Sequence, residues 1–205
     1  MAGSLGTLGL ILEVSLNVPP LPFAEATLKL EIPQDRAIGI LNHWGGKPLP
    51  ISACAWAEGD LVVRLSGAAS AVKAAREAIG GESIEPDQAQ RFWLGIREQT
   101  DPFFRTDKPL WRLSVPSVTP PLALPGEQLI EWGGSLRWLA SNADGRTIRE
   151  AAAQAGGHAT LFRASDKGAG VFTPLAPALA KIHRNLKQAF DPAGIFNPGR
   201  MYPDL

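Results

Sequence analysis

Residues 26–84 alternate between strand and helix patterns in the order β-α-β-β-α-β, and this order most constrains the fold. Apolar residues recur at every second position in the strand segments and at helical spacing between them. The expected elements are a strand over 26–32, a helix over 34–44, strands over 51–57 and 60–66, a helix over 68–79 and a short strand near 83. Glu58-Gly59 separates the two central strands as a tight hairpin turn, since glycine readily adopts positive φ. Split β-α-β units place antiparallel strands in one sheet with helices on one face, so a ferredoxin-like unit is predicted.

The same order recurs more weakly in the second half of the chain. The expected elements are strands over 110–115, 129–132, 136–140 and 158–163, and a helix over 146–155. A crossover over 115–126 with four prolines stands where the first helix would be. A helix over 86–100 links the halves, and a final helix over 174–189 should pack on their core. The predicted fold class is therefore α+β, with duplicated ferredoxin-like units forming a mainly antiparallel sheet with helices on one face.

Composition excludes several classes of function. Lys and Arg total 20 and Asp and Glu total 20, without a run of like charge, so nucleic acid is not an expected partner. Cys54 is the single cysteine, which excludes an internal disulfide, and the three histidines have no ligand spacing, so no metal site is expected. No apolar stretch is long enough to span a bilayer. No carboxylate pair at a useful spacing emerges either, so no catalytic residue is named.

The start of the chain joins a glycine-rich loop to a strand pattern. Glycine recurs at every third position from Gly3 to Gly9, with hydroxyls at Ser4 and Thr7, and alternating apolar residues predict a strand over 8–18. The spacing is that of neither a Walker loop nor a dinucleotide fingerprint. Small residues with free N–H groups suit close approach to a pyrophosphate or flavin ring, and a disordered tail is the alternative.

The end of the chain carries the second distinctive segment, Phe190 to Arg200. Pro192 ends the final helix, and Gly194 permits a left-handed turn. The turn Asn197-Pro198-Gly199 would aim Asn197 and Arg200 in fixed directions. A structural C-terminal cap explains the same residues equally well.

Together the two segments resemble the vanillyl-alcohol-oxidase type of FAD-linked oxidases. In that family a Gly-Ser-x-Gly-Thr-Leu-Gly loop precedes the last strand of the FAD domain, and residues 3–9 match this loop. Members of the family end in Phe-Asp-Pro-x-Gly-Ile-Phe-Asn-Pro-Gly-Arg, and residues 190–200 match this motif. Within the family, the chain end through Pro203 is most similar to the E subunits of bacterial glycolate oxidases.

The resemblance implies a cofactor and a site. It places Gly3, Ser4, Leu5, Gly6 and Thr7 at the phosphates and ring of FAD, and Asn197 and Arg200 over the flavin pocket. It implies that residues 1–20 are a remnant of the FAD-binding domain, with the loop and its last strand, and that residues 21–205 are the cap domain. Since Met1 matches a methionine that often lies inside the chain in the family, we expect a fragment or a start codon assigned too late.

The resemblance also implies an activity. The parent protein would be a subunit of an FAD-dependent 2-hydroxy acid (glycolate) oxidase or dehydrogenase, in which the flavin accepts a hydride from the alcohol-bearing carbon. Its partners would be a larger catalytic flavoprotein subunit and an iron–sulfur subunit, in the cytoplasm, with any membrane association through those partners. The 205-residue chain alone would be inactive and without FAD.

A second class of function stays open. Doubled ferredoxin-like sheets also serve as non-catalytic small-molecule or subunit-interaction modules. That alternative requires Met1 to be the native start, so the genomic sequence upstream of its codon separates the two. An open frame encoding a glycine-rich loop supports the oxidase, and an in-frame stop supports the module.

Overall fold

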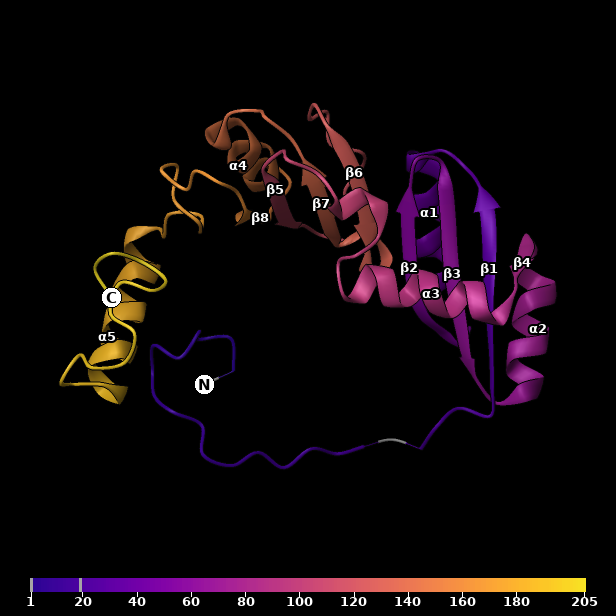
Figure 1. The fold of residues 1–205 in the computed structure, drawn as a ribbon, viewed down its shortest axis with the longest axis horizontal. Coiled ribbons are helices and arrows are strands. Elements are labelled where there is room, and N and C mark those ends of the chain that lie inside the picture. The colour runs from indigo at the N-terminus through magenta and orange to yellow at the C-terminus, as the bar shows by residue number, and fades with distance from the viewer. Residues whose placement is uncertain (1, 19) are drawn as a thin grey trace. The chain divides into compact units, whose positions relative to one another are not determined.

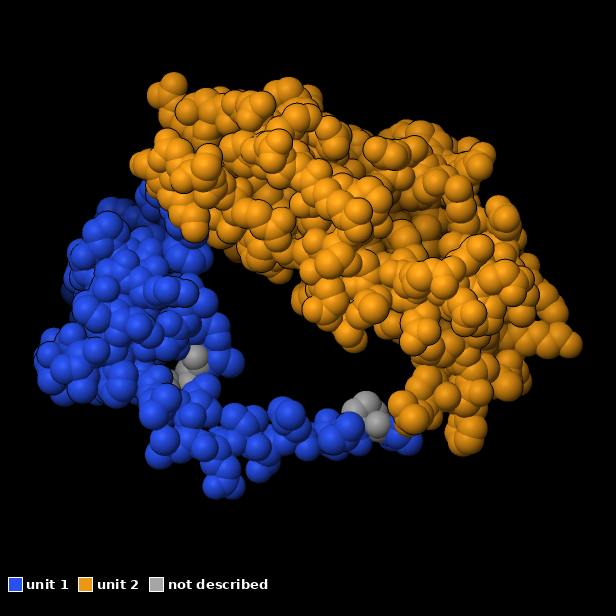
Figure 2. All heavy atoms as spheres, viewed as in Figure 1, with its two compact units in different colours: residues 1–20, 170–205 blue, residues 21–169 orange. Residues whose placement is uncertain are grey.

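A computed structural model describes residues 2–18 and 20–205, so Met1 and the inferences about it lie outside the described residues. The chain divides into two compact units, coloured separately in Figure 2. Residues 1–20 and 170–205 form the smaller unit, and residues 21–169 form the larger one. The predicted assignment of residues 1–20 and 21–205 to two parts of a flavoprotein stays a prediction.

The larger unit follows the predicted order of elements along its whole length (Figure 1). Its first half contains β1 (Ala24–Glu31), α1 (Gln34–Gly45), β2 (Ile51–Ala57), β3 (Asp60–Gly67), α2 (Ala69–Ile79), β4 (Glu82–Ile84) and α3 (Pro86–Arg97). Its second half contains the 3-10 helix η1 (Pro102–Phe104), β5 (Leu110–Ser114), β6 (Glu127–Glu131), the 3-10 helix η2 (Trp132–Gly134), β7 (Leu136–Ala140), α4 (Gly145–Gln154) and β8 (His158–Arg163).

The strands of the larger unit form one sheet in the order β4-β1-β3-β2-β6-β7-β5-β8. Every strand pair described is antiparallel. Each half has the same internal order, in which the first strand lies between the third and the fourth, and β2 and β6 join the halves through three residue pairs. The predicted α+β fold of duplicated ferredoxin-like units is therefore confirmed.

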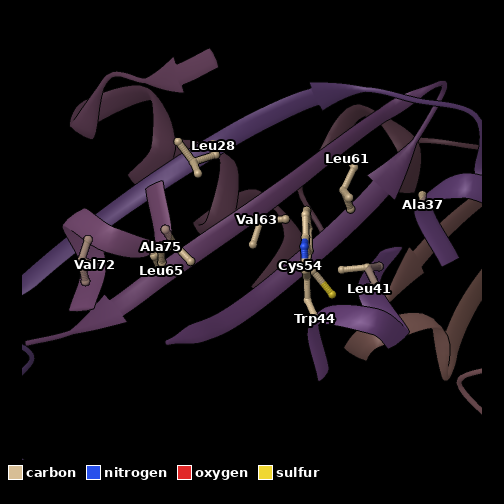
Figure 3. Packing of buried hydrophobic residues seen from close by; sticks show 10 residues of the cluster. All are labelled: Leu28, Ala37, Leu41, Trp44, Cys54, Leu61, Val63, Leu65, Val72 and Ala75. Atoms are coloured by element: carbon tan, nitrogen blue, oxygen red, sulfur yellow. The ribbon is translucent and has the colours of Figure 1, made fainter. Parts of the chain in front are cut away.

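One face of the sheet is covered by α1, α2 and α4, as predicted. Inward-facing leucine and valine side chains of β1 and β3 pack with α1 and α2 in the cluster drawn in Figure 3. On the other half, Ile148 and Ala152 of α4 pack against Trp111, Leu139 and Leu161. Because side chains alternate along a strand, these contacts assign alternate residues of each strand to this face.

The remaining helix of the larger unit, α3, lies on the opposite face. Trp93 on α3 donates its indole N–H to Thr27 Oγ1 at 3.0 Å, and Arg64 of β3 stacks on the Trp93 ring. Thr27 and Arg64 alternate with residues that point to the α1 and α2 side. The linking helix therefore covers the face that the two repeated units leave free.

The proline-rich crossover replaces the helix that the second half lacks, and a buried arginine holds it. Arg137 of β7 is 1% exposed and donates to the carbonyl oxygens of Gly134 at 3.0 Å and Pro120 at 2.8 Å, and also to that of Thr119. Burial lowers the pKa of the guanidinium. The carbonyl groups of an irregular segment are thus satisfied by one side chain rather than by a helix.

The smaller unit departs from two predictions. Residues 8–18 form no strand, and Leu12 and Leu16 are 88% and 81% exposed. The alternation gives this segment two faces, but a strand also needs a hydrogen-bonded neighbour, and none of the described strands pairs with it. The final helix, α5 (Pro177–Phe190), has no residue that is classed as buried, whereas its apolar spacing predicted a buried face.

Candidate functional site

The glycine-rich loop folds into a compact turn within the smaller unit. The backbone amide and the hydroxyl of Thr7 both donate to the carbonyl oxygen of Ser4, at 3.0 and 2.8 Å. Leu5 and Gly6 between them have φ of +51° and +75°. Thr7 is buried, so the loop has a defined conformation with an inward-facing end.

The C-terminal segment folds over the end of α5 as the sequence predicted. Asp191 closes the first turn, because its carbonyl accepts from the amide of Gly194 at 3.0 Å and its carboxylate accepts from the amides of Ile195 and Phe196 at 3.1 and 2.8 Å. Asn197 follows with a φ of +41°. Its carbonyl then accepts from the amide of Arg200 at 3.2 Å, which closes the second turn.

The loop and the turn meet, although more than 180 residues separate them. Asn197 Nδ2 donates to the carbonyl oxygens of Leu5 and Gly6, at 3.3 Å each. A Cβ on Gly6 would lie 2.7 Å from that nitrogen, so any larger residue would displace the Asn197 amide from this position. Thr7 Oγ1 also lies 3.9 Å from Met201 Sδ. The structure therefore brings the two distinctive segments into one site.

The predicted residues have different places in this site. Leu5, Gly6 and Asn197 are in direct contact, and Ser4 and Thr7 close the loop. Gly3 has a φ of +81° with no heavy atom within 4 Å of where its Cβ would be, so its backbone is open to a ligand. Arg200 joins the site through its backbone and has an exposed side chain.

Sequence reasoning missed Lys187 and missed the role of Asp191. Lys187 Nζ donates to Asp191 Oδ2 at 2.6 Å, to the carbonyl of Thr7 at 2.8 Å and to the carbonyl of Phe196 at 2.6 Å. Burial alone would raise the pKa of the Asp191 carboxyl, but the bonds from Lys187 and two backbone amides outweigh it and hold that pKa below its usual range. The spacing of four residues between Lys187 and Asp191 at the end of a helix was the sequence feature that could have predicted their ion pair.

The same side of α5 carries His183, one turn before Lys187. Its ring centroid lies 6.0 Å from that of Tyr202 in an edge-on arrangement, and Tyr202 donates its hydroxyl to the carbonyl of Thr173 at 3.1 Å. His183 is half-buried. The polar side of α5 thus faces the C-terminal segment, and its apolar residues Ile182 and Leu186 stay about half exposed.

The larger unit contains a separate hollow of about 1360 Å³ between α3 and the sheet. Its lining includes Trp93, Trp138 and Glu131. Trp138 donates its indole N–H to Glu131 Oε2 at 2.7 Å. Burial raises the pKa of the Glu131 carboxyl despite this bond. The hollow lies wholly within residues 21–169 and shares no residue with the loop and turn.

Two features are absent from the part of the chain that the structure describes. Across residues 2–18 and 20–205, no three His, Cys, Asp or Glu side chains come together as a group that could hold a metal ion. In the same ranges, no helix combines the length and the apolar composition needed to cross a membrane.

Comparison with known proteins agrees with the class that these two segments indicate. Residues 171–201, which include α5 and the C-terminal turn, match the family described as FAD linked oxidases, C-terminal domain. The resemblance to FAD-linked oxidases predicted from the sequence is therefore confirmed. Gly3 leaves its backbone open, and the side chain of Asn197 is exposed where it contacts Leu5 and Gly6.

A particular relative extends the similarity to the whole chain. Over all 205 residues the chain is 48% identical to the glycolate oxidase subunit GlcE of Escherichia coli (strain K12). The match covers 100% of this chain and 57% of that subunit, so the chain spans little more than half the length of this curated relative. The predicted similarity to glycolate oxidase E subunits is thus confirmed.

Proposed function

We propose that this chain is part of a subunit of an FAD-dependent 2-hydroxy acid oxidase or dehydrogenase acting on glycolate. The observation that carries the proposal is the junction of the Gly3–Thr7 loop with the Asn197 turn. The turn lies within the segment that matches FAD-linked oxidases, and the loop resembles a loop of the same family. Flavin, when bound, supplies the hydride acceptor for oxidation of the alcohol-bearing carbon. The similarity to a glycolate oxidase subunit supports the substrate class.

In this proposal the residues of the loop and the turn border the cofactor. The open backbone at Gly3 permits close approach of a flat ring or a phosphate, since no side chain intervenes. Asn197 donates to the carbonyls of Leu5 and Gly6 next to that backbone. Arg200, with its exposed guanidinium, is placed to attract a phosphate or a carboxylate. These residues orient the cofactor, and we assign no proton transfer to them.

The proposal extends to assembly and location. We propose that the subunit works with a larger catalytic flavoprotein subunit and an iron–sulfur subunit, in the cytoplasm, with any membrane association supplied by those partners. The similarity to a protein named as a subunit of glycolate oxidase supports a multi-subunit enzyme. We also expect residues 1–205 alone to be inactive, since the proposed site is only one border of a flavin pocket.

The test uses the protein expressed from its full reading frame. We expect it to retain FAD after unbound cofactor is removed and, with its partner subunits and without oxygen, to lose visible flavin absorption when glycolate is added. Gly3→Asn should reduce FAD retention, because its side chain would enter the open space beside the loop. Gly59→Asn is the matched control, since Gly59 also has positive φ and open space but lies in the β2–β3 hairpin. Absence of bound FAD from the wild-type protein would contradict the proposal.

One observation favours the second candidate, a non-catalytic small-molecule module. The hollow beside α3 has a volume of about 1360 Å³ and is lined by tryptophan and charged side chains, which suits ligand binding without a flavin. That candidate predicts that Gly3→Asn changes no ligand-dependent property of the protein. Substitution of Trp93 on α3 would instead abolish ligand binding.

A further inference from the structure

The smaller unit contains a buried ion pair at the junction of three segments. Lys187 comes from α5, its acceptor Thr7 ends the glycine-rich loop, and its acceptors Asp191 and Phe196 belong to the C-terminal turn. The side chains of Lys187 and Asp191 are 13% and 2% exposed. Lys187 therefore bonds to both the loop and the turn from α5.

The hydrogen-bonding capacity of Lys187 is fully used. An ammonium group has three N–H donors, and the three acceptors lie at 2.6, 2.6 and 2.8 Å. The carboxylate of Asp191 is satisfied in the same way, by Lys187 and the amides of Ile195 and Phe196. A buried charge is tolerated when it is paired and its remaining donors or acceptors are bonded. Neither residue can therefore be replaced without leaving a buried polar group unpaired.

The contacts of Asn197 depend on this arrangement. Asn197 immediately follows Phe196, whose amide and carbonyl are both bonded within the ion-pair cluster. On the other side, Gly6 precedes Thr7, whose carbonyl Lys187 holds. The two 3.3 Å bonds from Asn197 to Leu5 and Gly6 are long and exposed, and such bonds contribute little alone. The bonds of Lys187 are shorter and less exposed, so they are better placed to set the distance between loop and turn.

We propose that Lys187 and Asp191 are positioning residues that hold the Gly3–Thr7 loop against the C-terminal turn, and thereby fix the cofactor-facing backbone of both. This inference rests on the proposed function for its consequence, which is FAD affinity, but the positioning itself is a property of the chain. Lys187 acts through Thr7 and Phe196 rather than by contact with the cofactor.

Two readouts test the proposal. The first is amide hydrogen exchange in the 205-residue chain at Thr7, Ile195, Phe196 and Arg200, whose amides are all hydrogen-bonded in the junction. The second is the FAD dissociation constant of the protein from its full reading frame. The variants are Lys187→Met and Asp191→Asn, alone and combined, with Lys181→Met as the control on an exposed position of the same helix.

We expect each single variant to speed exchange at these amides without changing exchange in the β1–β8 sheet. We also expect each to weaken FAD binding by about tenfold to a hundredfold, the range for a lost charged hydrogen bond. The double variant should be less impaired than the product of the two single effects, because no unpaired charge is left. Lys181→Met should change neither readout.

The outcomes separate the two proposals. Unchanged exchange in Lys187→Met would overturn the positioning role, and so would faster exchange with wild-type FAD affinity. If the wild-type protein binds no FAD, the proposed function fails, and the exchange measurements alone decide whether Lys187 and Asp191 position the loop.

Discussion

The contact between Gly6 and Asn197 gives a quantitative prediction for the loop. Gly6→Ala introduces a Cβ 2.7 Å from Asn197 Nδ2 at a residue with a φ of +75°. Gly3→Ala introduces a Cβ at a φ of +81° with no heavy atom within 4 Å. A left-handed conformation costs an L-residue about 1–2 kcal/mol, and both variants incur this cost. The difference between them therefore isolates the displacement of Asn197.

The magnitude of that difference follows from the bonds that Asn197 makes. The amide end of Asn197 is a flexible group and will move, which removes its two 3.3 Å bonds to the loop carbonyls. Long, exposed hydrogen bonds are at the weak end of the usual range, so the pair together contributes about 1 kcal/mol. Gly6→Ala should accordingly open the loop about fivefold more than Gly3→Ala does.

Amide hydrogen exchange at Thr7 measures this opening, since its N–H is bonded to Ser4 across the loop. The cycle is completed by repeating both alanine substitutions in an Asn197→Ala background, where the excess cost of Gly6→Ala should vanish. Equal protection in Gly6→Ala and Gly3→Ala would refute the reasoning. An excess that persists without Asn197 would also refute it, because the clash would then lie elsewhere.

Three further predictions concern stability, each measured by urea unfolding. Arg137→Met removes the side-chain donor from three backbone carbonyls around a buried residue and should cost about 3 kcal/mol. Arg146→Met, at an 84% exposed side chain, should cost less than about 0.5 kcal/mol. Ile148→Ala, at a fully buried residue of α4, should cost about 2–4 kcal/mol of stability. Ile182→Ala, at a 53% exposed residue of α5, should change stability little. A large effect at Ile182 would mean that α5 packs on a core. The pKa of Glu131 is raised by burial, so its ionisation costs stability as pH rises above its unfolded value of 4.5. Relative to Glu131→Gln, wild-type stability should therefore fall from pH 4 to pH 7, and parallel curves would contradict this.

The local elements could be predicted from the sequence because their signals are local. The β2–β3 hairpin was assigned from two alternating patterns around Glu58-Gly59, and those residues have φ of +52° and +94° in the structure. The duplication could also be predicted, since the order of elements repeats. Even the missing helix of the second half was visible as a proline-rich crossover.

What could not be predicted depends on partners distant in sequence. Residues 8–18 alternate as a strand does, but alternation does not supply the neighbour that a strand requires. The apolar spacing of α5 predicted a buried face, whereas the partly buried positions of the helix are Ala180, His183 and Lys187. Arg137 bonds to carbonyls 17 and 18 residues away, and no periodicity indicates that role.

The site was predicted only in part for the same reason. Motif resemblance selected Gly3 to Thr7 and Asn197, and the structure brings the loop and Asn197 into contact. Lys187 lies outside both motifs, and its bond to Thr7 spans 180 residues. A lysine four residues before an aspartate is a common exposed pair on helices, so the sequence alone did not distinguish this buried pair from a surface one.

Retention of FAD by the protein from its full reading frame tests the central claim most directly. The flavin absorbance spectrum would be recorded after excess FAD is added and the unbound cofactor removed, for wild type, Gly3→Asn and Gly59→Asn. We predict bound flavin near one per chain for wild type and Gly59→Asn, and a clear loss for Gly3→Asn. Absence of flavin from the wild-type protein, or equal retention by all three, would contradict a cofactor site at the loop and turn.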